Sequence, residues 1–168
     1  MNLPDSTNLP AVISPELLAF VRRRFLLGPH SIHGPDHWLR VWENGRRLAE
    51  LNGADLEVVA LFAFTHDMAR EDEGADWQHG PRAARIIQHE LNGWLIHLPP
   101  DRLSLLVEAV HGHTEGHCRA ELTVQTCWDA DRLDLGRAGI RPDPRRLCTA
   151  QARDPLILQW ANQRSNCC

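Results

Sequence analysis

The sequence lacks several features that would place it in a common class of protein. No run reaches the roughly 18 consecutive apolar residues of a membrane-spanning helix. The early apolar stretch AVISPELLAFVRRRFLL is broken by Pro15 and by the arginines at 22–24, and it lacks the basic-then-apolar order of a signal peptide. The net charge of −4 gives no general attraction to nucleic acid or anionic lipid. We therefore expect a cytoplasmic protein that binds neither nucleic acid nor membrane.

Cysteines with metal-binding spacing are also missing. The 5 cysteines are an odd number and contain no C-x-x-C pair, which argues against a disulfide framework and against a zinc ribbon. Cys127 lies in an apolar pattern and is expected to be a small buried hydrophobe. The polar end NQRSNCC is expected to fray. The 10 histidines, several of them inside apolar segments, are more informative.

Strand patterns are nearly absent, because few β-branched residues alternate between turn residues. Helix patterns dominate, with prolines at starts, side-chain caps and glycines past the ends. No repeat divides the chain, and 168 residues fit one domain of the usual roughly 100–200. We predict an all-α fold with a solvated acidic loop at 71–77, one or two short outer helices after residue 141, and helices at 15–27, 34–53, 54–70, 81–93, 99–113 and 122–136.

The predicted helix at 54–70 ends in an adjacent histidine and aspartate. This helix is apolar nearly all round and should therefore lie in the middle of the domain. His66 and Asp67 each follow apolar residues three and four positions earlier, so both side chains should point into protein. Burying a carboxylate without a partner costs several kcal/mol, and proteins pair such charges or give them to a metal.

Other predicted helices repeat this pattern. Asp131 continues an apolar stripe at helical spacing, whereas Asp129 falls beside polar neighbours, so Asp131 is expected to be the buried acid. His37 lies in an apolar row, and spacing favours neither His111 nor His113. Each residue alone is more simply a structural one. Four helices that each turn a ligand type inward are better explained by a shared metal, and this ligand set suits zinc, manganese, iron, cobalt or nickel.

These residues occur in the order of a known family. The segments HWLRV, THD and DADRLD resemble the H…HD…D pattern of the HD-domain metal-dependent phosphohydrolases over about residues 33–140. The resemblance implies a single HD domain over 1–168, in which 141–168 forms short helices and a tail. It also implies one divalent metal, held by the residues that match the motif: His37, His66, Asp67 and Asp131.

Some members of this family hold a second metal through further histidines. The segment HGPRAARII, beginning at His79, resembles one that carries such a ligand, although a helix cap explains His79 equally well. AVHGHTEG resembles another, in which Gly112 separates His111 from His113, and we favour His113. With two metals, Asp67 would bridge them. The implied cofactor is one or two divalent ions of manganese, iron, zinc, cobalt, nickel or magnesium.

The expected reaction is hydrolysis of a phosphomonoester or phosphoanhydride. A divalent ion lowers the pKa of bound water from about 15.7 towards about 7, which makes hydroxide available without a protein nucleophile. Asp67 is the central expected catalytic residue. Arg40 and Arg70, one turn after predicted ligands, either contact phosphoryl oxygens or lie on solvated helix faces, whereas Arg132 is expected in solvent.

The expected partner is a small phosphorylated substrate, with nucleotides the first expectation from the family. Two other functions stay open. Some similar HD proteins are di-iron oxygenases that cleave carbon–carbon or carbon–phosphorus bonds, and a third possibility is a non-catalytic sensor of metal or nucleotide. The complete H…HD…D set argues against a degenerate sensor. The sequence leaves the substrate and the oligomeric state undetermined.

Overall fold

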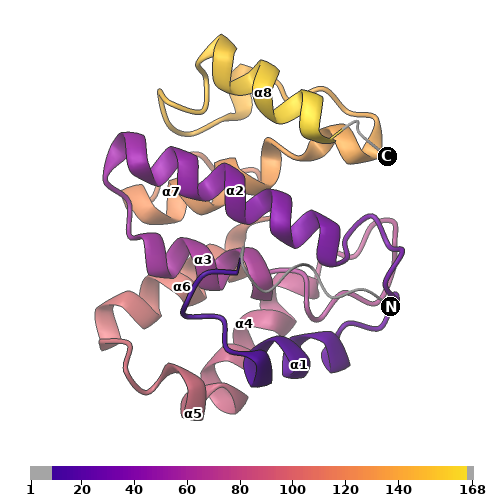
Figure 1. The fold of residues 1–168 in the computed structure, drawn as a ribbon, viewed down its shortest axis with the longest axis vertical. Coiled ribbons are helices and arrows are strands. Elements are labelled where there is room, and N and C mark those ends of the chain that lie inside the picture. The colour runs from indigo at the N-terminus through magenta and orange to yellow at the C-terminus, as the bar shows by residue number, and fades with distance from the viewer. Residues whose placement is uncertain (1–8, 166–168) are drawn as a thin grey trace.

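The computed structural model describes residues 9–165. Over this range the chain forms eight α-helices and no strand (Figure 1), which confirms the predicted all-α fold. The elements are α1 (Pro15–Arg24), α2 (Pro35–Asn52), α3 (Leu56–Thr65), α4 (His79–Glu90), α5 (Asn92–Leu95), α6 (Pro100–Gly112), α7 (Leu122–Arg132), the 3₁₀ helices η2 (Leu135–Ala138) and η3 (Pro144–Arg146), and α8 (Pro155–Ser165). None of these helices is long and apolar enough to cross a membrane.

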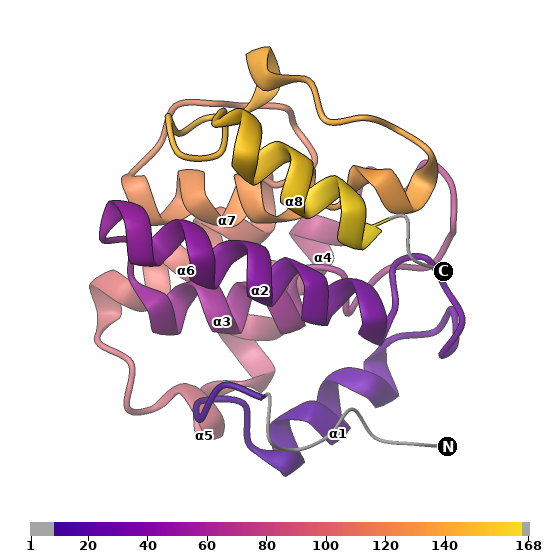
Figure 2. The same cartoon turned by 45° about the horizontal axis from the view of Figure 1, so that its top comes forward.

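Helix α3 lies at the centre of the fold, as its composition predicts. It packs against α1, α2, α6 and α7, and all residues from 58 to 65 are buried. Asp55 caps it by accepting hydrogen bonds from the amides of Glu57 and Val58. Figure 2 shows α2 with α3 on one side of it and α7 on the other. The end of α3 therefore delivers the next residues of the chain into the interior.

Several helix ends differ from their predicted positions. The first helix stops at Arg24 because Phe25 adopts an extended backbone and packs its ring edge-on against Trp38, 5.3 Å between centroids. The third and sixth predicted helices correspond to α3 and α7 and end at Thr65 and Arg132. Hydrogen bonds of the i→i+3 type tighten the chain beyond these residues. The fourth spans 79–90 instead of 81–93.

The C-terminal part forms a second core, with α8 on one end of the molecule (Figure 1). Residues 162–165, expected to fray, belong to α8, and 166–168 lie outside the described residues. Cys127 is buried as predicted. The second core covers the side of α7 that periodicity assigned to solvent, and its buried members are Leu48, Leu133, Leu147, Ala152, Ile157 and Ala161.

This second core explains why the prediction for Asp129 was wrong. Asp129 is fully buried, and its carboxylate accepts hydrogen bonds from the amides of Cys148 and Thr149 at 2.7 and 2.8 Å. Burial raises the pKa of Asp129, and these hydrogen bonds oppose the rise. Asp129 thus fastens the loop after η3, whereas Asp131, whose side chain is 17% exposed, points towards the histidines.

Candidate metal centre

Six of the seven predicted metal ligands come together at one end of α3. His66 and Asp67 lie on the turn that follows α3, and the others are brought in by the start of α2, the start of α4, the end of α6 and the last turn of α7. All but Asp131 are buried. The six residues are His37, His66, Asp67, His79, His113 and Asp131.

The first half of this cluster surrounds Oδ2 of Asp67. The Nε2 atoms of His37 and His66 lie 3.6 and 3.5 Å from it. These two nitrogens are 3.1 Å from each other. Asp131 closes the group, with its Oδ1 3.3 Å from His37 Nε2 and 3.9 Å from His66 Nε2.

The second half surrounds the other carboxylate oxygen of Asp67, Oδ1. The Nε2 atoms of His79 and His113 lie 3.0 and 3.5 Å from it and 2.8 Å from each other. The side chain of His79 therefore faces the cluster, although the residue also begins α4. Asp67 lies between two histidine pairs and presents one oxygen to each.

The four histidines share an orientation. Each directs Nδ1 to an oxygen outside the cluster, which leaves Nε2 inside. A carboxylate or carbonyl only accepts, so Nδ1 carries the proton and a neutral ring presents a lone pair at Nε2. The acceptors are Asp134 for His37 at 2.7 Å, Phe62 for His66 at 3.2 Å, Val110 for His113 at 2.7 Å, and Asp76 for His79.

The donor atoms of this cluster fit divalent cations. Four Nε2 lone pairs and two carboxylates face one another, and lone pairs at 2.8–3.3 Å repel unless a proton or a cation lies between them. Oδ1 of Asp131 is buried and has no hydrogen-bond partner among the described residues. A buried oxygen of this kind requires a partner that the protein atoms do not supply. Imidazole nitrogen and carboxylate oxygen are ordinary ligands of zinc, iron, manganese, cobalt and nickel.

The protonation states also suit metal binding. Burial lowers the pKa of His66 to about 3, so its ring is neutral at pH 7. Burial opposes ionisation of Asp67, but the imidazole rings around it, that of His66 first, outweigh burial and hold its pKa well below the usual range. A neutral imidazole and an ionised carboxylate are the forms that bind metals.

Comparison with known proteins places this arrangement in a family. The chain matches the HD domain family over residues 36–153. It belongs to the HD domain family. A crystal structure of a predicted HD superfamily hydrolase from an uncultured Thermotogales bacterium is similar, with 25% identity, a TM-score of 0.70, and coverage of 97% of this chain and 92% of that one. None of the curated proteins matches the chain. The HD match includes the whole cluster and ends before α8.

Two side chains beside these six residues, called the HD cluster from here on, were not predicted from the sequence. His33 is buried, with Nδ1 3.1 Å from Asp67 Oδ2 and Nε2 3.3 Å from the carbonyl oxygen of Glu73. Its sequence signal was its place four residues before His37, in the turn that leads into the helix of His37. Arg137, on η2, was overlooked because a 3₁₀ turn has no apolar face to mark it.

Arg70 and Arg137 reach the cluster in the same manner from two sides. Arg70 donates from Nε and Nη2 to the carbonyl oxygens of residues 72 and 74, and its Nη1 lies 3.9 Å from Asp67 Oδ1. Arg137 donates from Nε and Nη1 to the carbonyl oxygens of residues 32 and 134, and its Nη2 lies 3.7 Å from Asp131 Oδ1. Both guanidinium groups are nearly buried and held by backbone, with one nitrogen turned to the HD cluster.

The other two arginines have structural partners. Arg40 donates from Nε to Oδ1 of Asp134 at 2.7 Å. Arg132, expected in solvent, instead donates to the carbonyl oxygens of His117 and Arg146 and so joins two loops. The expectation for Arg132 was wrong because a single helix pattern does not reveal the loops that fold back over α7.

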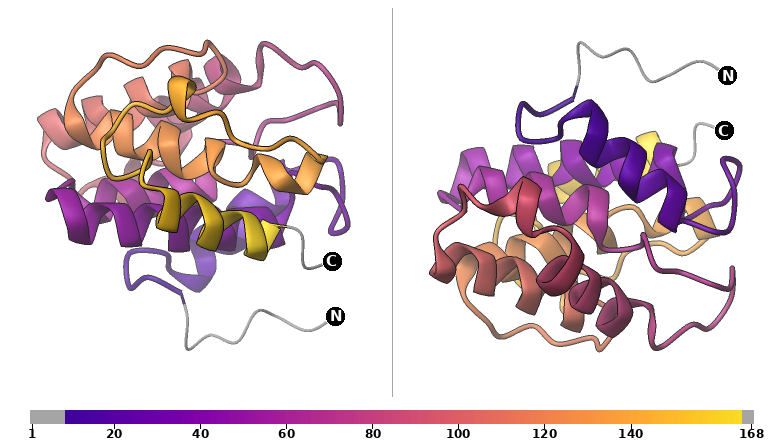
Figure 3. Two further views of the ribbon diagram at one scale, coloured as in Figure 1. Left: turned by 90° about the horizontal axis from the view of Figure 1, so that it is seen from above. Right: turned by 90° about the horizontal axis from the view of Figure 1, so that it is seen from below.

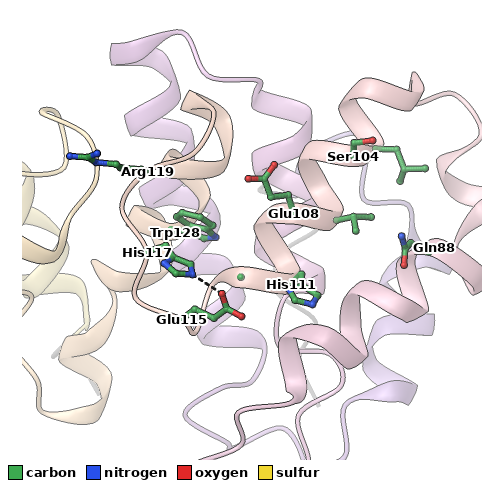
Figure 4. A pocket seen from close by; sticks show the side chains of 11 residues that line it. Gln88, Ser104, Glu108, His111, Glu115, His117, Arg119 and Trp128 are labelled. Carbon is green, nitrogen blue, oxygen red and sulfur yellow. Dashed lines mark ion pairs between the residues drawn. The ribbon is translucent and has the colours of Figure 1, made fainter.

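His111 is the candidate ligand that the structure does not bring into the cluster. It is exposed and lines an open pocket of ≈ 530 Å³ that α4, α6 and α7 border (Figure 4). Glu115 and His117 form an ion pair of 2.8 Å in the same pocket, over Trp128. At the C-terminal end of α6, two residues apart, His111 thus faces outward and His113 inward.

Proposed function

We propose that this protein is a metal-dependent phosphohydrolase that hydrolyses a small phosphomonoester or phosphoanhydride. The observation that carries the proposal is the buried ring of four inward Nε2 atoms around Asp67, completed by the unpartnered Oδ1 of Asp131. Membership of the HD domain family and the similarity to a predicted HD superfamily hydrolase support it.

We propose that the cluster holds two divalent ions. His37, His66, Asp67 and Asp131 would hold one, while His79 and His113 would hold the other with the second oxygen of Asp67. When bound, such ions lower the pKa of water and polarise a phosphoryl oxygen. The absence of a nucleophilic serine or cysteine from this cluster of the described residues agrees with attack by water.

The chain's own contribution to the reaction is a fixed set of cationic donors. We propose that Arg70 and Arg137 bind the phosphoryl oxygens of the substrate, each through the Nη atom that backbone hydrogen bonds leave facing the cluster. Guanidinium groups that are already oriented stabilise developing charge without reorganisation. Arg40 is assigned no such contact, because its Nε is committed to Asp134.

The proposed substrate is small and phosphorylated, with nucleotides tested first. We further propose that the protein acts in the cytoplasm without nucleic acid or membrane as a partner, in line with its net charge of −4.

The test is a hydrolysis screen of the purified full chain supplied in turn with manganese, iron, zinc, cobalt, nickel and magnesium. Nucleotides, sugar phosphates and an aryl phosphate are offered, and phosphate release is measured in air and without oxygen. We expect release with at least one metal, equal in both atmospheres, and none from chelator-treated protein. Turnover that requires oxygen would contradict the proposal and favour an oxygenase. A nucleotide that raises the Tm but is never hydrolysed would instead favour a sensor.

A further inference from the structure

We propose that Asp134 is a positioning residue for His37, and that α8 takes part in the metal centre by holding Asp134 through Ser165. This inference rests on the proposed function, because it assigns a role around the proposed metal ligands. It extends the site to a segment that lies beyond the matched residues 36–153.

Asp134 is completely buried in the turn between α7 and η2. Its Oδ2 accepts a hydrogen bond from Nδ1 of His37 at 2.7 Å. Its Oδ1 accepts from Nε of Arg40 at 2.7 Å and from Oγ of Ser165 at 2.8 Å. In addition, the Nη1 atom of Arg137 lies 3.9 Å from Oδ2 of Asp134. Two hydrogen bonds therefore hold Oδ1 of Asp134, which fixes the carboxylate so that Oδ2 faces His37.

The bond from His37 to Asp134 determines which nitrogen faces the cluster. The carboxylate accepts a hydrogen bond from Nδ1–H, so Nε2 carries the lone pair that faces the cluster. Nε2 of His37 lies 3.1 Å from Nε2 of His66 and 3.3 Å from Oδ1 of Asp131. His37 is the member of the four whose Nδ1 bonds to a carboxylate, since carbonyl oxygens serve the other three.

Helix α8 is fixed firmly enough to transmit this constraint. Ser165 is 1% exposed, and α8 rests on the second core through Ile157 and Ala161. The neighbouring Arg164 donates to Oδ1 of Asn44 at 2.9 Å, on the helix that also carries His37. Figure 3 shows α8 lying against α2 in the view from above. The last turn of α8 thus contacts the helix that carries His37, through Arg164, and the carboxylate of Asp134, through Ser165.

The experiment compares cobalt binding to metal-free protein for the wild type, Asp134→Asn and Ser165→Ala. Ser104→Ala is the matched control, because Ser104 bonds to a helix carbonyl on α6 away from the cluster. Loss of a hydrogen bond to a metal-ligating histidine weakens metal binding roughly 10- to 100-fold, which we expect for Asp134→Asn. Loss of one supporting donor in Ser165→Ala should weaken it about 3- to 10-fold. The visible cobalt spectrum should shift in both variants and stay unchanged in Ser104→Ala.

The outcomes separate this inference from the proposed function. Ser165→Ala removes a single oxygen and supplies the answer if Asp134→Asn fails to fold. Wild-type affinity and spectrum in the folded variants, with only a lower Tm, would overturn the positioning role and leave the proposed function standing. Weakened cobalt binding in the variants of a protein that hydrolyses no phosphate would support the positioning role and sink the phosphohydrolase. A wild-type chain that binds no divalent ion would sink both.

Discussion

The buried cluster and the outer pocket of Figure 4 contain the same kinds of residue in opposite circumstances. In the pocket, His117 and Glu115 are 63% and 46% exposed, pair with each other and are open to water. In the cluster, His66 and Asp67 are at most 3% exposed, and the imidazole lone pairs face other acceptors. The two regions adjoin along α6, where His111 and His113 are separated by one residue.

This difference is why the buried cluster, and not the outer pocket, is the candidate metal centre. An exposed pair satisfies itself with water and with its partner, and it contributes little. Buried imidazoles and carboxylates whose N–H protons all point away from one another still lack a positively charged partner between them. Burial and the second nitrogen of each ring therefore carry more information than the residue type.

Among the variants that test this comparison, Asp67→Ala is expected to have the largest effect. It removes the carboxylate shared by both halves of the cluster, so we expect bound metal and phosphate release to fall together to background, about a hundredfold or more. Elemental analysis and the hydrolysis assay measure the two losses, and far-ultraviolet circular dichroism should show that helicity is retained. Full activity in this variant would refute the assigned site.

The next test replaces each of the two histidines at the end of α6 in a separate variant. His113→Gln removes one inward Nε2 and should lower metal content and activity by roughly 10-fold or more. His111→Gln alters the outer pocket and should match the wild type in both measurements. Equal losses in the two variants would mean that the inward and outward positions do not differ in function.

Asp55→Ala tests a carboxylate whose partners are all protein groups. Asp55 caps the start of α3, at the opposite end from the HD cluster. Loss of this cap should cost about 1–2 kcal/mol of unfolding free energy at pH 7, with metal affinity unchanged. Burial opposes its ionisation, but Arg102 and two amides outweigh burial and lower the pKa of Asp55 from the ordinary 3.8. Its stabilising effect is therefore present above about pH 4 and lost as pH falls through the lower folded value. Urea unfolding of both proteins at pH 7 and pH 3 should show the difference shrinking in acid.

The smallest effect is expected for Glu115→Gln in the outer pocket. Its ion pair with His117 is exposed, and such pairs contribute about 0–1 kcal/mol. Stability should change by less than about 0.5 kcal/mol, and metal content and hydrolysis should not change. A loss of activity here would show that the pocket, not only the cluster, belongs to the working site.

Helical periodicity was sufficient to predict the fold class and the inward direction of His66 and Asp67. It succeeded there because α3 is buried on all sides, so the turn that directly follows it also lies in the interior. The same reasoning failed for Asp129, since a stripe on α7 assumes one covered face and the second core covers another. The residues 141–165 that build this core contain prolines and turns from which packing cannot be read.

The supporting residues of the cluster were beyond the reach of a helical pattern. His33 lies in a loop and Arg137 and Asp134 in tight turns, where side-chain direction depends on tertiary contacts and not on a period. Asp134 occurs in the quoted DADRLD segment, three residues after Asp131, yet its partner His37 is 97 residues away. Long-range pairs of this kind are set by the packing of α2 against α7.

The long separation between His37 and Asp134 along the chain affects when the candidate site can assemble during synthesis. On the ribosome, His37, His66 and Asp67 emerge well before Asp131, Asp134 and Ser165. A nascent chain cannot assemble the first ligand group until α7 has left the exit tunnel, and Ser165 fastens it only after α8 has followed.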